Sequence, residues 1–115
     1  METTAEDTQL DAVFTALGDH TRRDIVARLS AGEATVKELA EPYAMSMQAV
    51  SQHIRVLERS GLISQGRHRQ TRPCRLEPAA LEAALSWIEE SRRAWSERLD
   101  RLETHLARLQ EGPEK

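Results

Sequence analysis

The chain has 115 residues, of which 30% are charged and 39% hydrophobic, and its formal net charge is -3. A chain of this length normally forms one small domain, here with an extension, and buries roughly 65% of its unfolded surface. The acidic total argues against a general nucleic-acid coat protein. The single cysteine, Cys74, excludes an intrachain disulfide and a thiol-rich metal cluster within one chain.

The N-terminal residues and the hydropathy pattern predict a cytoplasmic protein. The first twenty residues include Glu2, Glu6, Asp7 and Asp11. They do not show the basic start and apolar run of a signal peptide. No window approaches the roughly 20 apolar residues of a membrane span. We therefore expect a protein of the reducing cytosol with no membrane partner.

Apolar spacing and capping residues predict three short helices before Pro42. The first spans about two turns, ends at Gly18 and carries apolar residues at i, i+3, i+4 and i+7: Leu10, Val13, Phe14 and Leu17. The second can be capped by Asp19 or Thr21, ends at Gly32 and has a buried stripe of Ile25, Val26 and Leu29. Thr35 and Glu38 have capping-box spacing for the third.

A helix-turn-helix and a β-hairpin, or wing, are predicted next. Ser46 can cap a fourth helix that runs to Ser60, with Gly61 in the C′ position. Two helices joined by a tight turn are typical of the helix-turn-helix motif. Leu62 and Ile63, then Cys74 and Leu76, indicate two short strands around a polar loop, and Pro73 requires its strand to lie at an edge.

The fourth helix and the wing form a basic island in an acidic chain. Residues 51–75 carry six arginines against one acid, a net charge of +5. If Val50, Ile54 and Leu57 face the core, a polar face poor in carboxylates turns outward. Gln, Arg and Ser are residue types that bond base edges or phosphates. The alternative for this face is simple solvation. The face and the wing together predict DNA contact, with Ser46, Gln48, Ser51, Gln52, Arg55, Arg67 and Arg69 as the candidates and His53 at the flank of the face.

A long final helix is predicted from Pro78 to the Gly112-Pro113 pair, about 50 Å at 1.5 Å per residue. Its apolar residues alternate at spacings of four and three, with Arg92 at one stripe position, which is the period of helix pairing. We expect Leu81, Leu85 and Ile88 to face their own domain and the distal half to face a second copy. The expected dimer interface on this helix is Trp95, Leu99, Leu102, Leu106 and Leu109.

The sequence contains no pattern for catalysis or for a bound cofactor. The four histidines are scattered, whereas metal ligation is usually visible as donor pairs at short spacing. No nucleophile and base stand together, and there is no glycine-rich phosphate loop. Cys74 could be reactive between Arg72 and Arg75, but an inward-packing strand residue is the better interpretation. We predict no metal, no cofactor and no enzyme activity.

The order of elements and three motifs resemble the ArsR/SmtB family of bacterial winged helix-turn-helix repressors. The motifs are Ala16-Leu17-Gly18-Asp19 with Thr21-Arg22-Arg23, Val36 to Ala40, and the string from Met45 to Ile63. The resemblance covers about residues 10–110 and implies a recognition helix in the major groove, a wing on flanking DNA and a dimer built by the first and last helices. Carried over to this sequence, it implies DNA contact by Gln48, Ser51, Gln52, His53, Arg55, Arg67 and Arg69. It also adds Leu10 and Phe14 of the first helix to the expected dimer interface. The cysteine pair and histidine ligands of the family's metal sensors are missing, and no effector is indicated.

We therefore predict a mainly α fold with a small β-hairpin, in which residues 8–77 form the winged helix-turn-helix domain and residues 78–111 the dimerisation helix. The predicted function is sequence-specific DNA binding by a homodimeric transcriptional repressor on a two-fold symmetric operator. Two alternatives stay open. One is a winged-helix protein-interaction module without DNA binding, and the other is a metal- or thiol-responsive sensor repressor.

Overall fold

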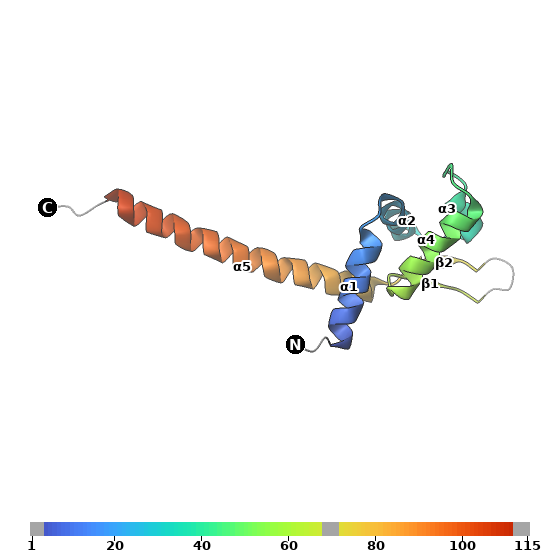
Figure 1. The fold of residues 1–115 in the computed structure, drawn as a ribbon, viewed down its shortest axis with the longest axis horizontal. Helices are drawn as coiled ribbons and strands as arrows, with labels where there is room; N and C mark the ends of the chain where they lie inside the picture. Colours follow the sequence, from blue (N-terminus) through green and yellow to red (C-terminus); the bar gives the residue numbers. More distant parts are fainter. Residues whose placement is uncertain (1–3, 68–71, 112–115) are drawn as a thin grey trace. The chain divides into compact units, whose positions relative to one another are not determined.

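The computed structural model describes residues 4–67 and 72–111 and has the predicted order of elements (Figure 1). They are α1 (Ala5–Leu17), α2 (His20–Ala31), α3 (Val36–Ala40), α4 (Met47–Arg59), β1 (Ile63–Gln65), β2 (Cys74–Leu76) and α5 (Pro78–Glu111). The mainly α fold with a hairpin and a long last helix is therefore confirmed. Two compact units divide the chain, Met1–Ala84 and Leu85–Lys115, so the first two turns of α5 belong to the first unit.

Side-chain caps begin each of the first four helices. Asp19, rather than Thr21, caps α2, and Ser46 caps α4 by accepting the backbone N–H of Ala49 at 3.1 Å. Helix α1 starts at Ala5 and is longer than the two turns predicted. Thr4 and Asp7 form a capping box at its start. Both residues are polar, so the spacing of apolar residues gave no sign of this extra turn.

The core of the first unit is built from the predicted stripes. Val50, Ile54 and Leu57 of α4 are at most 1% exposed. They pack in one cluster with the other predicted stripe and with buried side chains of α1, α3 and the hairpin: Ile25, Val26, Leu29, Val13, Ala16, Leu39, Leu62, Ile63 and Cys74. Burial of three residues spaced along α4 sets the rotation of the helix and turns its polar residues outward.

The wing is tied to this core through Cys74. Strands β1 and β2 pair antiparallel in the register Ile63↔Leu76 to Gln65↔Cys74. Cys74 also forms a bridge with Ala34, in which its N–H donates to the Ala34 carbonyl at 2.7 Å and its carbonyl accepts at 3.2 Å. Strand β2 therefore has β1 on one side and Ala34 on the other.

The prediction that Leu81, Leu85 and Ile88 face their own domain is wrong for two of the three. Leu81 packs partly against the core, whereas Leu85 is 56% and Ile88 44% exposed. The buried residues of α5 are instead Ala80 and Ala84. Small side chains one turn apart let a helix backbone approach its neighbours closely, and a leucine at either position would need space that this packing does not contain.

This packing generates a stability prediction. Ala80→Leu should lower the free energy of unfolding by about 1 to 3 kcal/mol, because extra methylene groups in a filled core force neighbouring side chains out of their rotamers. Ala83→Leu, on the exposed side of the same helix, is the matched control and should change it by less than about 0.5 kcal/mol. Urea denaturation at one protein concentration measures both. Equal midpoints for the two variants would show that Ala80 is not closely packed.

Candidate nucleic-acid interface

The outward face of α4 is polar and accessible. Gln48, Gln52 and Arg55 are exposed, and Ser51 is half-buried beside them. The one acid of the helix, Glu58, lies in its last turn. Ser46 accepts from Ala49 with its hydroxyl oxygen, which leaves the hydroxyl proton available to a ligand. The face therefore offers donors and acceptors of the kinds that bond base edges and phosphate oxygens.

Within the described residues, no carboxylate neutralises the arginines beside this face. Arg55, Arg59, Arg67 and Arg72 are exposed, and within residues 4–67 and 72–111 none of them lies within ion-pair distance of a carboxylate. Arg75 forms an exposed pair with Glu77 at 4.0 Å, which is worth little in solvent. Arg69, also predicted to contact DNA, lies outside the described residues. The described cations of the basic island remain available to an external anion.

Three other arginines hold the fold together instead. Arg23 donates to the carbonyl of Leu17 at 2.9 Å. Arg28 donates to the carbonyls of Leu39 at 2.8 Å and Glu38 at 3.1 Å, with its guanidinium 5.5 Å from the ring centroid of Tyr43. The third is Arg22, which donates to carbonyls at the end of α1. Because helix carbonyls at a C-terminus lack intrahelical partners, these bonds satisfy groups that would otherwise need water.

His53 lies at the flank of the polar face, as predicted, but its ring also contacts α2. Its Nδ1 is 3.3 Å from Nη1 of Arg22 and 3.8 Å from Oδ2 of Asp19. Sequence periodicity could say only that Arg22 is off the buried stripe of α2. It gave no signal for the contact between Arg22 and His53.

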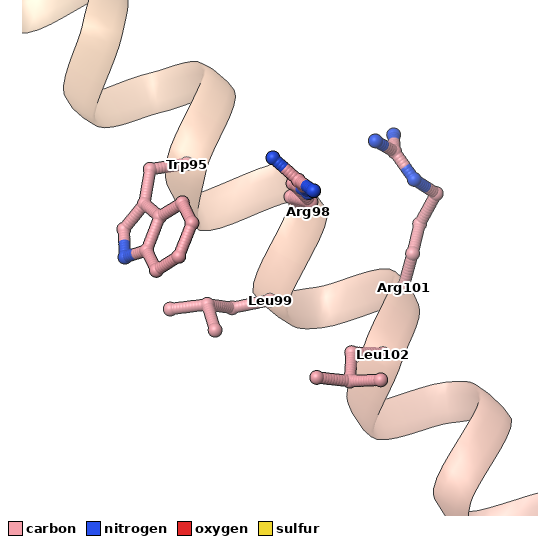
Figure 2. Close-up of a pocket in the computed structure, with 5 residues that line it drawn as sticks. All are labelled: Trp95, Arg98, Leu99, Arg101 and Leu102. Atoms are coloured by element: carbon pink, nitrogen blue, oxygen red, sulfur yellow. The ribbon is translucent and has the colours of Figure 1, made fainter.

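The predicted dimer residues lie in two groups. Leu10 packs partly against the core, and Phe14 is 36% exposed. The distal residues of α5 are exposed by between 44% for Leu99 and 63% for Leu109. Figure 2 shows Trp95, Leu99 and Leu102 projecting from one side of the helix, with Arg98 and Arg101 flanking them. The guanidinium of Arg98 lies 5.9 Å from the ring centroid of Trp95. Large apolar residues that share one side of a helix in water are typical of an interface.

Neither a metal cluster nor a reactive thiol is present in the described part of the chain. Residues 4–67 and 72–111 contain no group of three or more His, Cys, Asp or Glu side chains placed to hold an ion. Cys74 is fully buried, and desolvation, followed by the charge of Glu58, raises the pKa of its thiol to about 11. Over the same described residues, no helix is long and apolar enough to cross a membrane.

Comparison with known proteins identifies the family. Residues 17–65 match a helix-turn-helix domain model. The HTH-type transcriptional regulator Rv2034 of Mycobacterium tuberculosis is 41% identical over 73 residues, 64% of this chain and 68% of that protein. The crystal structure of the ArsR family transcriptional regulator RHA00566 has 39% identity and a TM-score of 0.73, over 77% of this chain and 92% of that one. The chain belongs to the ArsR family of transcriptional regulators.

Two further relatives of this ArsR-family protein are a repressor and a homodimeric DNA-binding domain. The transcriptional repressor SdpR of Bacillus subtilis is 30% identical over 79 residues, 69% of this chain and 88% of SdpR. A homodimeric winged helix-turn-helix DNA-binding domain of Mb0332 from Mycobacterium bovis has 25% identity and a TM-score of 0.60, over 76% of this chain and 82% of that one. ArsR-family proteins are a class of transcription regulators, which is not an enzyme class.

The environment of Cys74 generates a reactivity prediction. Because a pKa of about 11 leaves very little thiolate at pH 8, native protein should react with iodoacetamide at least about 100-fold more slowly than a free cysteine, and should react at the ordinary rate once unfolded in urea. Mass spectrometry of timed samples measures both rates. Rapid alkylation of the native protein would reopen the thiol-sensor alternative.

Proposed function

We propose that this ArsR-family protein represses transcription as a homodimer bound to an operator of imperfect two-fold symmetry. The observation that carries the proposal is the outward face of α4, which is rich in hydrogen-bonding groups and adjoins exposed arginines that no described carboxylate pairs. Such a face, on a helix capped and anchored by its apolar stripe, fits the major groove of duplex DNA. The repressor SdpR is similar in sequence, which supports repression as the mode of action.

We assign base reading to the centre of α4, as the recognition helix, and phosphate contact to its N-cap and to the wing. Gln48 and Gln52 can bond an adenine edge in bidentate fashion, and Arg55 a guanine edge. Ser51 can bond either base edges or phosphate oxygens. The hydroxyl of Ser46 and the guanidinium groups of Arg67 and Arg69 would contact the sugar-phosphate backbone, and His53 would contact DNA from the flank of the helix.

The exposed stripe of α5 supports the homodimer. Five large residues in each of two chains, Trp95, Leu99, Leu102, Leu106 and Leu109, could gain a gross 15 to 30 kcal/mol at roughly 1.5 to 3 kcal/mol each on full burial. Association costs an estimated 4 to 15 kcal/mol, so pairing is favoured over most of that range. Arg92, at the stripe position without an apolar residue, is paired with Glu89 of its own helix at 3.0 Å. Leu10 and Phe14 of α1 would complete the interface.

The alternatives have less support in the described residues. A protein-interaction module that has lost DNA binding does not need unpaired arginines beside a polar helix face. A thiol sensor requires an accessible thiolate, and Cys74 is buried with a raised pKa. We further propose that the protein acts in the cytoplasm, in keeping with DNA as its partner.

The division between base and phosphate contacts is testable with two variants. Gln52→Ala should lose about 1 to 3 kcal/mol of discrimination between the operator and unrelated DNA. Arg67→Ala should weaken binding to all sequences and reduce the slope of log affinity against log salt by about one for each phosphate that is no longer neutralised. Arg93→Ala, an exposed arginine of α5, is the control. Fluorescence anisotropy over a salt series measures all three, and equal losses of Gln52→Ala on both DNAs would assign Gln52 to phosphate.

The dimer is testable on the exposed stripe. Leu99→Glu should convert the dimer to a monomer at micromolar concentration, because two carboxylates would lie in an apolar seam. Ala94→Glu introduces the same side chain at an exposed position outside the stripe and should leave the dimer intact. Sedimentation velocity distinguishes the two species. A wild-type protein that stays monomeric would contradict the proposed assembly.

A further inference from the structure

The ring of His53 is held by a network that joins α1, α2 and α4. The guanidinium of Arg22 donates from Nε to the carbonyl of Ala16 at 2.7 Å and from Nη2 to the carbonyl of Thr15 at 3.1 Å. Its third nitrogen, Nη1, is 3.3 Å from Nδ1 of His53. Two carbonyls at the end of α1 therefore hold the guanidinium in place and aim its remaining group at one nitrogen of the imidazole.

This contact decides which ring nitrogen carries the proton. A guanidinium has only donors, so Nδ1 can bond to Arg22 only as an acceptor, and the proton of the neutral ring is then on Nε2. Asp19 does not compete for Nδ1, because its Oδ2 at 3.8 Å is beyond hydrogen-bond distance. The Asp19 carboxylate is occupied as the cap of α2, where it accepts the backbone N–H of Arg22 at 3.1 Å.

The other nitrogen of the ring is accessible. No hydrogen bond of Nε2 is present among the described residues, and every buried side-chain nitrogen or oxygen of the described residues has a partner. Nε2 therefore reaches solvent, on a residue that follows Gln52 in the recognition helix. Its N–H can donate to a phosphate oxygen or to an acceptor on a base edge.

We propose that Arg22 is a positioning residue that fixes His53 in the Nε2–H tautomer, so that the recognition helix presents a donor of set direction to DNA. The inference rests on the proposed function for its ligand. It goes beyond that function by assigning a role to a residue of α2 that acts on the DNA only through His53. Because Arg22 also bonds to α1, it fixes the ring of His53 in α4 relative to the C-terminal end of α1. Helix α1 is also proposed to take part in the dimer interface.

The tautomer can be measured without DNA. In a long-range ¹H–¹⁵N spectrum of the full-length protein, the neutral ring of His53 should show a protonated Nε2 and an unprotonated Nδ1. Arg22→Gln should shift the two ¹⁵N signals toward the mixture of tautomers seen for a free imidazole. Arg23→Gln removes only a bond to the Leu17 carbonyl and should leave them unchanged. A protonated Nδ1 in the wild type would overturn the proposal.

Two substitutions of His53 separate its nitrogens in DNA binding. His53→Gln places an amide donor near the position of Nε2 and should bind within about threefold of the wild type, since one donor replaces another. His53→Asn keeps an acceptor for Arg22 but loses the outer donor, and should weaken operator binding on the order of 10- to 100-fold for two subunits. Equal affinities for all three proteins, or equal losses for both variants, would overturn the role of Nε2–H.

Arg22→Gln completes the design, because a positioning residue must act through the ring. As a single substitution, Arg22→Gln should weaken operator binding severalfold. Added to His53→Asn, where the donor is already absent, it should weaken binding less. Effects that simply multiply would assign Arg22 to the stability of α1 alone. If the wild type binds no DNA, the proposed function and the DNA role of His53 both fail, whereas the tautomer spectrum still reports on Arg22 directly.

Discussion

Burial of Val50, Ile54 and Leu57 is the constraint on which the rest of the structure depends. Each fully buried aliphatic side chain contributes roughly 1.5 to 3 kcal/mol, and the three together allow α4 only one rotation about its axis. Turning the helix by one residue would bring Arg55 and Glu58, or in the other direction His53, into an apolar core, where an unpaired polar group costs several kcal/mol. The polar face is presented to solvent because no other orientation of this sequence is stable.

The arginines of the first unit divide into two classes by their partners. Arg22, Arg23 and Arg28 donate hydrogen bonds to carbonyls at helix ends. Their guanidinium groups therefore stabilise the fold itself. Arg55, Arg59, Arg67 and Arg72 are exposed, with no carboxylate in range among the described residues. An acidic protein can in this way present a cationic surface. The net charge of -3 describes the whole chain and not this side of it.

Much of the fold could be predicted because its signals are local. The capping residue Ser46, the buried stripe of α4 and the glycine at C′ lie within sixteen consecutive residues, and the structure confirms each, with Gly61 at φ 86°. The exposed Leu85 and Ile88 were not foreseen, because a heptad stripe gives the period of a helix but not where along the stripe its own domain stops covering it. The small side chains of Ala80 and Ala84 mark the part of the helix that packs closely against the core.

The candidate site was predictable in composition and not in its contacts. Spacing placed His53 at the edge of the polar face of α4. The contact between its ring and Arg22 joins residues 31 positions apart, and no local pattern encodes it. For the same reason the two roles of arginine could not be separated in the sequence, since a helix-end carbonyl is a partner that only the folded backbone supplies.

The central claim is that two copies of one recognition surface bind duplex DNA about a two-fold axis. Repeated selection of bound sequences from random duplex DNA by the full-length protein tests it most directly. We expect enrichment of one inverted repeat whose half-sites lie about one helical turn apart, roughly 10 base pairs between centres, or a multiple of that spacing. Recovery of no enriched sequence, or of a single unrepeated site, would contradict the claim.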